Sequence, residues 1–528
     1  MNSQTRLNSN CLKQIFEYIV DSSEYLHITH KTLHSCILVS KHFCENAMPI
    51  LWRNPWNPST NKFKNNYNKK LSISKTILSC LLYHYQQEND LMDIYESTTS
   101  MDGPTFKPPL FDYISYCKYV NYQDIERITR TLLERKHELK IFIKNKHKKV
   151  TLLEYIWKLF MIKCNNLEYL RCPNNFNISC LPGSQSSLES LRELECELKK
   201  DSSHLKLTVN FTGLAKICHN LTSITIKPLD KDNRGLAALI RSQNDLRELN
   251  LFTNQPMVKD LRFIDQALLI QSRYIETLTI KGNFYLENSF LSSLYNLKRL
   301  QIKFATINNI NYFLDTAILP NLESLSIQLN YYTFDFSLDH YTRLISRTKG
   351  HLRKFEIINA TRPPTRILGL QPYLQSLITH CPQINSVRIW YINDFLDDFK
   401  HLLTNAEHLN SIELDFLEMH LSNYYAIYDD DDESEREREL HAKLLLDALA
   451  RLSSYNLNHL YLHNLWWLLP RELDFFLESW KKKMIRLTLK LKADGKIHLN
   501  PYLDVIEKHV KEGTLTDDSG LWVKEFPY

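Results

Sequence analysis

The sequence predicts an α/β solenoid that follows a small N-terminal helical domain. Three observations lead to this expectation: an apolar motif that recurs through most of the 528 residues, a different apolar pattern near the N-terminus, and a low glycine content. Only 10 glycines occur, about a quarter of the number expected from an average share of about 7%. Folds that turn on many glycines, such as propellers, are therefore disfavoured.

The recurring motif has the form Φ-x-x-Φ-x-Φ, where Φ is apolar and x is any residue. Twelve copies start 22 to 32 residues apart, except for one interval of 48. The last two Φ positions alternate, so a short strand would point both to one side. In order, the copies are Leu167/Leu170/Cys172, Leu191/Leu194/Cys196, Leu221/Ile224/Ile226, Leu246/Leu249/Leu251, Ile275/Leu278/Ile280, Leu297/Leu300/Ile302, Leu322/Leu325/Ile327, Leu352/Phe355/Ile357, Ile384/Val387/Ile389, Leu409/Ile412/Leu414, Leu457/Leu460/Leu462 and Met484/Leu487/Leu489.

Helices are predicted between these strands. Residues 235–241, 265–270 and 373–378 carry apolar residues three and four positions apart, which gives each segment one buried helical face. One strand and one helix cannot bury both of their apolar faces alone, so neighbouring repeats must stack. The period is close to the 20–29 residues that are typical of leucine-rich repeats.

Three copies have a cysteine three residues before their first Φ position: Cys164, Cys218 and Cys381. With the period, this resembles the cysteine-containing class of leucine-rich repeats. The resemblance implies a curved solenoid with parallel strands on its inner face and helices on its outer face. We expect these thiols to be small core residues, because single cysteines so far apart lack the spacing of metal ligands.

Turn residues offer an explanation for the few glycines. Asparagine, serine and proline stand near the repeat turns, as at Asn165, Asn166, Asn220, Asn244 and Asn321. Asparagine tolerates a left-handed backbone better than most residues do. We therefore expect these residues to turn the chain where glycine is missing.

Residues 7–53 carry the second pattern. Ser9 and Asn10 can cap a helix. An apolar stripe at i, i+3, i+4 and i+7 follows, then a second apolar segment over 33–43 that leads to a Leu-Trp pair. The residues at apolar and turn positions are Leu12, Ile15, Phe16, Ile19, Leu33, Cys36, Val39, Ser40, Lys41, Leu51 and Trp52.

This arrangement resembles the F-box, although Asn8 and Asn10 stand where that family has proline and an acid, and segment 21–32 is longer than in the compact form. F-box followed by leucine-rich repeats is a known pairing, and the whole chain resembles fungal proteins of this type. The resemblance implies a Skp-type adaptor as partner, and through it a cullin, while the repeats recruit a protein substrate for ubiquitination. The expected adaptor contacts are Leu7, Leu12, Ile15, Phe16, Ile19, Val39 and Leu51, with Trp52 packing the box.

An alternative gives the N-terminal segment a purely structural role. Repeat arrays need terminal caps, and residues 7–53 would then bury their apolar stripe within the chain. The protein would in that case be a ligase-independent scaffold for protein interactions.

The expected domains are an F-box-like domain at 1–55, a helical connector at 56–150, the solenoid at 151–500 and a tail at 501–528.

The 48-residue interval holds an acidic insertion at 429–439, with eight acids and two arginines. It is predicted as a disordered loop or a solvated helix start, or else as a lure for basic partners. Trp466 and Trp467 follow a repeat strand and either form an exposed binding anchor or fill the core; they are candidate substrate contacts.

Other chemistries find little support. The sequence lacks the phosphate-loop, dinucleotide, nucleophile-elbow and zinc-protease motifs, so we expect no enzyme activity, cofactor or metal. His27, His30 and His34 could share a helical face and hold a metal, but their polar surroundings favour exposed residues. Segment 135–149 holds seven Lys/Arg against one Glu and could contact nucleic acid, yet its apolar centre favours a connecting segment.

The expected location is intracellular, cytoplasmic and/or nuclear. The eleven cysteines show no paired spacing, which is typical of reduced thiols. The N-terminus has no apolar signal-peptide core, and no apolar run reaches the roughly 18 residues of a membrane span.

Overall fold

The computed structural model describes residues 8–22, 26–56, 67–85, 107–134, 146–172, 177–197, 204–255, 258, 261–284, 290, 292–305, 307–329, 335–359, 366–416, 432–463, 468–493 and 500–523. Its contacts divide the chain into two compact units, residues 1–246 and 247–528. No helix among the described residues combines the length and the apolar character that a bilayer crossing requires.

The first unit starts with helices and continues with strand-and-helix repeats. Its elements are α1 (Ser9–Ser22), α2 (Leu26–Ile37), α3 (Lys41–Leu51), α4 (Tyr67–His84), the 3₁₀ helix η2 (Tyr113–Tyr116), β1 (Tyr119–Asn121), α6 (Tyr122–Glu134), α7 (Lys146–Lys163), β2 (Tyr169–Cys172), η3 (Ile178–Cys180), α8 (Ser184–Leu188), β3 (Glu193–Glu197), α9 (His204–Ala215), β4 (Ser223–Lys227) and α10 (Arg234–Arg241).

The second unit repeats the same alternation to the C-terminus. It contains β5 (Glu248–Phe252), α11 (Arg262–Gln271), β6 (Thr277–Lys281), β7 (Arg299–Ala305), α13 (Ile307–Thr316), β8 (Ser324–Leu329), β9 (Asp335–Ser337), α14 (Asp339–Ser346), β10 (Lys354–Asn359), β11 (Arg366–Leu368), α15 (Leu370–His380), β12 (Ser386–Tyr391), η4 (Asn393–Phe395), α16 (Leu396–Asn405), β13 (Ser411–Phe416), α17 (Asp432–Leu452), β14 (His459–His463), α18 (Pro470–Lys481), β15 (Thr488–Ala493), α19 (Asn500–Lys511) and β16 (Gly520–Val523).

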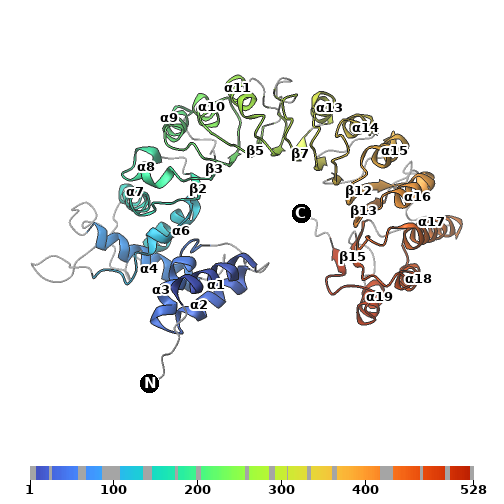
Figure 1. The fold of residues 1–528 in the computed structure, drawn as a ribbon, viewed down its shortest axis with the longest axis horizontal. Coiled ribbons are helices and arrows are strands. Elements are labelled where there is room, and N and C mark those ends of the chain that lie inside the picture. Colours follow the sequence, from blue (N-terminus) through green and yellow to red (C-terminus); the bar gives the residue numbers. More distant parts are fainter. Residues whose placement is uncertain are drawn as a thin grey trace, which may run out of the picture. The chain divides into compact units, whose positions relative to one another are not determined.

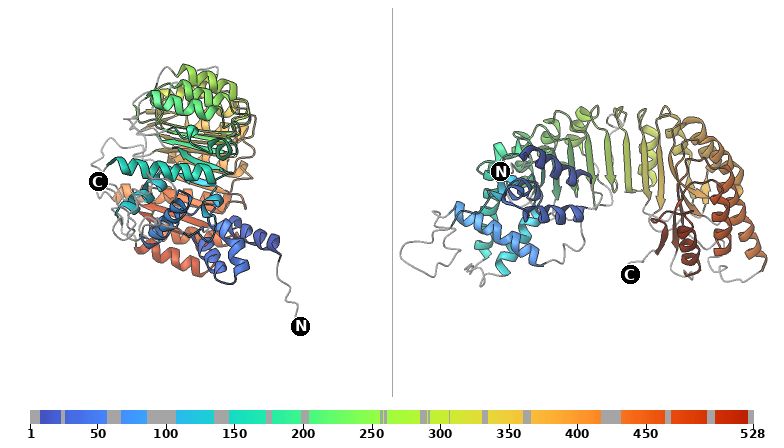
Figure 2. Two further views of the ribbon diagram at one scale, coloured as in Figure 1. Left: turned by 90° about the vertical axis from the view of Figure 1, so that its left-hand side faces the viewer. Right: turned by 60° about the horizontal axis from the view of Figure 1, so that its bottom comes forward.

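The predicted α/β leucine-rich-repeat solenoid is confirmed. Within each unit, parallel strands follow one another in chain order, and β9 and β11 form a separate two-stranded sheet. In each unit taken by itself, the strands line the inner side and the helices cover the outer side (Figures 1 and 2). β1 lies inside the range 56–150, where only helices are expected, and β16 lies inside the tail, so the strands extend beyond the predicted range 151–500.

The repeat motif sets the register. Leu170, Leu194 and Ile224 stand opposite one another on β2, β3 and β4, and the corresponding strand positions of the second unit align in the same way. The first Φ residues of the initial eleven copies are all buried, so each copy contributes three side chains to the core. Cys164 and Cys218 are also buried, and their thiols donate to the carbonyls of Ile114 and Leu188 at 3.2 and 3.5 Å.

The twelfth copy is the one that the motif places wrongly. Met484 is 96% exposed and adopts a φ of 57°. On β15 it is Leu489 and Leu491 that stand opposite Leu460 and Leu462. The strand register of the last copy therefore lies two residues further along the chain than the motif predicts, although the predicted Leu487 and Leu489 are both buried.

The asparagines turn the chain in a different way from the one expected. Among the described residues, only Lys349 and Met484 have a positive φ apart from glycines. Instead, asparagine side chains donate to backbone carbonyls of a preceding repeat: Asn296 to Arg273 at 2.6 Å and Asn321 to Tyr295 at 2.7 Å. These side-chain hydrogen bonds satisfy turn carbonyls that would otherwise have to accept hydrogen bonds from water.

One glycine is required by close packing. Gly235 in α10 lies against α9, and a Cβ there would come within 2.2 Å of the Thr208 carbonyl oxygen. Gly235→Ala is expected to destabilise the first unit by about 1–3 kcal/mol, because the backbone of α9 must move. Denaturant unfolding of the variant measures the loss. Gly520→Ala is the matched control, since a Cβ at that residue would have nothing within 4 Å; an equal effect of both changes would contradict the packing argument.

Candidate functional site

The first candidate surface belongs to the N-terminal helical domain, α1 to α3. This domain has a core of its own, made by Leu12, Phe16, Leu33, Ala47 and Ile50, which are all at most 8% exposed. Ser40 caps α3 by accepting the Phe43 amide at 3.2 Å. Leu12 and Phe16 of the apolar stripe of α1 are thus buried within the three helices themselves.

Two apolar pairs of this domain remain at the surface. Ile15 and Tyr18, which share one side of α1, are 45% and 72% exposed. Leu38 and Val39, in the turn between α2 and α3, are 74% and 65% exposed. Exposed pairs of large apolar residues on a small domain are typical of a partner-binding surface.

The predicted adaptor contacts therefore separate into different environments. Ile15 and Val39 reach the surface, whereas Leu12 and Phe16 are only 1% exposed and cannot touch a partner without unfolding the domain. Ile19 and Leu51 are partly buried against the same core. Trp52 is buried, with its ring centroid 4.7 Å from that of Tyr113. Leu7 lies outside the described residues.

A hydrogen-bonded junction joins this domain to the first repeat. The Arg53 carbonyl accepts the amides of Lys118 and Tyr119 at 3.0 and 3.3 Å. The Trp56 indole donates to the Tyr119 carbonyl at 3.0 Å. Trp52 and Trp56 thus attach the helices to η2 and β1.

The second candidate surface is the inner strand face of each unit, formed by the strand residues that alternate with the core positions. In the first unit, Arg171 pairs with Glu197 at 2.7 Å and Lys227 with Glu195 at 3.3 Å. The Tyr169 hydroxyl donates to Glu195 at 2.9 Å, and burial and this carboxylate raise the tyrosine pKa. This part of the face carries carboxylates whose charge is largely matched by neighbouring cations.

A compact charge network lies on β12 to β14 in the second unit. Arg388 contacts Glu413 at 2.5 Å and Asp415 at 2.8 Å, and His463 contacts Glu413 at 2.5 Å. The four side chains are only 10 to 22% exposed. Burial alone would raise the pKa of Glu413, but the hydrogen bond from His463 and the charge of Arg388 outweigh it and hold this pKa below its ordinary value.

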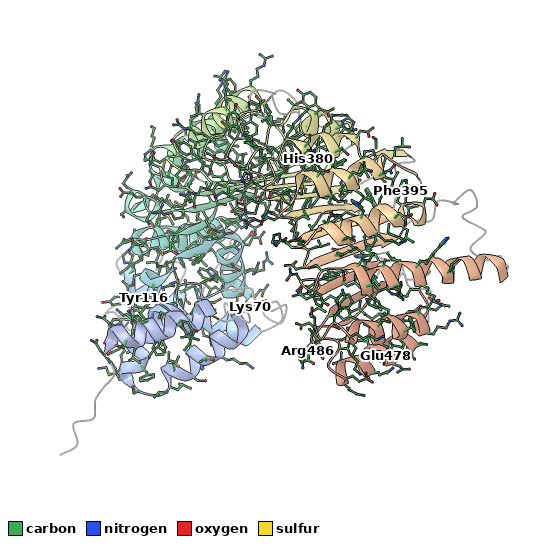
Figure 3. The ribbon with its side chains drawn as sticks, turned by 45° about the vertical axis from the view of Figure 1, so that its right-hand side comes forward. Lys70, Tyr116, His380, Phe395, Glu478 and Arg486 are labelled. Carbon is green, nitrogen blue, oxygen red and sulfur yellow. The ribbon has the colours of Figure 1, made fainter. Side chains whose placement is uncertain are left out.

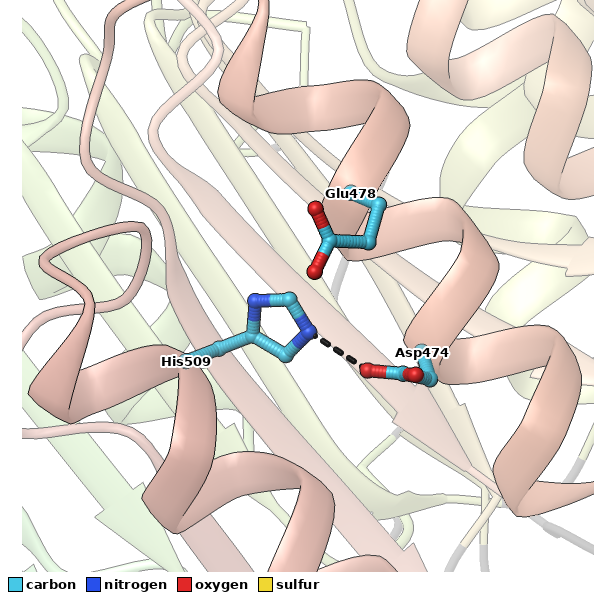
Figure 4. Close-up of side chains that lie close together, drawn as sticks. All are labelled: Asp474, Glu478 and His509. Atoms are coloured by element: carbon cyan, nitrogen blue, oxygen red, sulfur yellow. Dashed lines mark hydrogen bonds and ion pairs between the residues drawn. The ribbon is translucent and has the colours of Figure 1, made fainter.

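Among the described residues, one group has the composition of a metal site: Asp474 and Glu478 on α18 and His509 on α19 (Figure 4). His509 is fully buried and contacts Asp474 at 2.8 Å. The Lys508 ammonium already lies 2.8 Å from Asp474 and 3.1 Å from Glu478. A cation of the chain thus neutralises both carboxylates, and the group joins α18 to α19 as an ion-pair network.

The helix side holds a shallow pocket of about 320 Å³ between α14 and α15. Arg343 and His380 are among its lining residues, and His380 is labelled in Figure 3. Arg343 is paired with Asp315 at 2.8 Å, so its charge is already matched.

Several sequence candidates lie wholly or partly outside the described residues. Trp466 and Trp467, residues 135–145 and residues 429–431 are not described. The backbone of 432–439 forms the start of α17. His27, His30 and His34 fall on α2, where only the side chain of His34 is described, and it is exposed.

No family model matches the chain, and no curated protein matches it. Two similar solved structures are the yeast Rad7 and Elc1 complex and the leucine-rich repeat-containing protein LegL7 from Legionella pneumophila. The first has 12% identity and a TM-score of 0.35, with 76% of this chain and 88% of that chain covered. The second has 13% identity and a TM-score of 0.30, with 60% of this chain and 98% of that chain covered.

Proposed function

We propose that this chain is the substrate-recruiting subunit of a cullin-type ubiquitin ligase and performs no chemistry itself. Its N-terminal domain would be an F-box that binds a Skp-type adaptor, and the repeats would hold a protein substrate. This role would place the protein inside the cell. The observation that supports the proposal is an independently packed three-helix domain with exposed Ile15, Tyr18, Leu38 and Val39.

The geometry suits such a division of roles. Leu12 and Phe16 of the apolar stripe fill the domain's own core. Trp52 and Trp56 connect the domain to η2 and β1 through their buried rings and the hydrogen bond of the Trp56 indole. An adaptor could bind the exposed pairs while the inner strand face stays open to a substrate.

Adaptor binding is expected to depend on the exposed residues. A chain with Ile15→Asp and Val39→Asp should bind a purified Skp-type adaptor at least about tenfold more weakly, because each change places a charge in an apolar contact. Calorimetry or a pull-down from purified components measures the loss, and circular dichroism checks that the helices persist.

The matched control is Val209→Asp, which places the same charge on an apolar side chain that is 58% exposed on α9. This variant should bind the adaptor like the unchanged chain. If the unchanged chain fails to bind any Skp-type adaptor, the ligase role is rejected and the ligase-independent scaffold becomes the better interpretation.

A further inference from the structure

The inner face of β5 to β8 has a composition of its own. Strand register aligns twelve inner-face positions in three rows. The first row is Glu248, Thr277, Arg299 and Ser324; the second is Asn250, Thr279, Gln301 and Ser326; the third is Phe252, Lys281, Lys303 and Gln328. Of these strands, β5 and β7 are labelled in Figure 1.

Cations gather on this part of the face. Lys281 and Lys303 stand directly opposite one another on β6 and β7. Arg299 lies on the same side of β7 and is exposed. Like charges opposite each other on adjacent strands repel, and Glu248 is the one carboxylate among the twelve positions.

Other cations on the inner face of this unit pair with carboxylates, whereas Arg299 and Lys303 do not do so among the described residues. Arg388 has two carboxylates and Lys354 pairs with Glu356. Within the described part of the chain, neither Arg299 nor Lys303 forms an ion pair with a carboxylate; Arg299 donates to the Thr277 hydroxyl at 3.1 Å. The patch on β5 to β8 therefore carries a net positive charge that an anionic partner would neutralise.

The middle row supplies uncharged hydrogen-bonding groups between the cations. Asn250, Thr279, Gln301 and Ser326 stand on four successive strands; the Asn250 amide donates to Glu248 at 2.8 Å, and Thr279 and Ser326 are only 9% exposed. Neighbouring strands lie about 4.8 Å apart, so the row spans about 14 Å. An extended peptide of about five residues covers that length, and the partly exposed Gln301 can bond its backbone.

We propose that the inner face of β5 to β8 binds a peptide segment rich in aspartate and glutamate. Lys281, Arg299 and Lys303 contact its carboxylates, and Gln301 bonds its backbone. The inference rests on the proposed recruitment function, because the bound segment would belong to the recruited protein.

Nucleic acid fits this patch less well than an acidic peptide does. Single strands bind through a groove of many cations together with aromatic rings on which bases stack. Of the twelve positions, three are cations and only Phe252 is aromatic. The uncharged middle row suits peptide amides better than it suits a line of phosphates.

Fluorescence anisotropy of the full-length chain, without adaptor, tests the proposal. The probe is a labelled ten-residue peptide of alternating Glu and Ser; the comparison peptide has Gln in place of Glu. The patch variant is Lys281→Gln, Arg299→Gln and Lys303→Gln. The matched control variant, Lys400→Gln, Lys443→Gln and Lys482→Gln, removes the same charge from the helix side of the same unit.

The glutamate peptide is expected to bind the unchanged chain and the control variant, and to bind the patch variant about tenfold more weakly, which corresponds to about 1.4 kcal/mol. Equal binding of the glutamine peptide, or equal weakening by both triple variants, would overturn the inference. So would the absence of binding, or tighter binding of a ten-residue oligothymidine that depends on the same three residues. Because the assay contains no adaptor, a negative result leaves the adaptor experiment unaffected.

Discussion

A chain carrying Phe16→Asp is expected to lose the N-terminal helical domain while the repeats stay folded. Phe16 is 1% exposed and packs with Leu12 and Leu33, and its ring centroid lies 5.9 Å from that of Phe43. Removing such a ring costs about 3–5 kcal/mol, and an unpaired buried carboxylate adds a further penalty. A domain with five buried core residues has too little stability to absorb this loss.

Hydrogen exchange resolves the effect along the chain. Amides of residues 9–51 should exchange rapidly in the variant, while those of β5 to β15 keep their protection. Ile15→Asp, one residue away on the same helix and 45% exposed, is the control and should leave exchange nearly unchanged. Uniform loss of protection over the whole chain, or none at all, would contradict a separately packed domain.

The second large loss of stability is expected when Arg388 is replaced by alanine. Arg388→Ala leaves Glu413 and Asp415 without their shared cation in a setting where both are less than a quarter exposed. Removing one partner of a fully buried pair costs about 3–5 kcal/mol. Because these side chains keep some exposure, we expect about 2–4 kcal/mol, seen as a lower melting temperature and faster exchange in β12 to β14.

The loss of stability in Arg388→Ala should depend on pH. The pKa of Glu413 is lowered in the folded chain, so its contribution to stability is present above the ordinary pKa of a glutamate and is lost as the pH falls through the lowered value. In Arg388→Ala, Glu413 loses the positive charge that helps to lower its pKa, so the difference between the two chains should narrow from pH 7 towards pH 4.

Lys400→Ala is the control for this second prediction. It removes an ion pair with Asp397, whose side chain is 94% exposed, and pairs of that kind contribute about 0–1 kcal/mol. A pH-independent loss in Arg388→Ala would mean that packing, and not the carboxylates, carries the effect.

The sequence predicts the strand array more clearly than it predicts the candidate binding surfaces. Alternating apolar positions at a near-constant period force each strand into register with its neighbour, because a slip by one residue would turn the core side chains outward. Met484 shows the limit of this reasoning. Its apolar side chain fits the motif, but the chain turns there with a positive φ and leaves the side chain in solvent.

The N-terminal contacts were only partly predictable for a geometrical reason. An i, i+3, i+4, i+7 stripe covers a wide sector of a helix, and Ile15 lies about 60° from Leu12 around the axis while Phe16 lies about 40° to the other side. Which edge of the stripe faces solvent depends on where α2 and α3 pack, and the pattern of α1 alone does not contain that information.

The sequence motif did not predict the inner-face residues, because they occupy its x positions, where any residue is allowed. Arg388 and Glu413 are 25 residues apart in sequence, yet strand register places them opposite one another. Stacking the copies of the motif in register would have revealed this pair, and likewise Lys281 opposite Lys303. The signal is present in the sequence but becomes visible only once the fold is assumed.

The hydrogen bonds from the junction to β1 also bear on aggregation. The first strand of an open sheet has an edge of unpaired amides that can recruit a strand from another molecule. Here the Arg53 carbonyl takes up the amides of Lys118 and Tyr119. A fragment that begins after residue 56 would expose that edge and is therefore expected to associate through β1 more readily than the full chain.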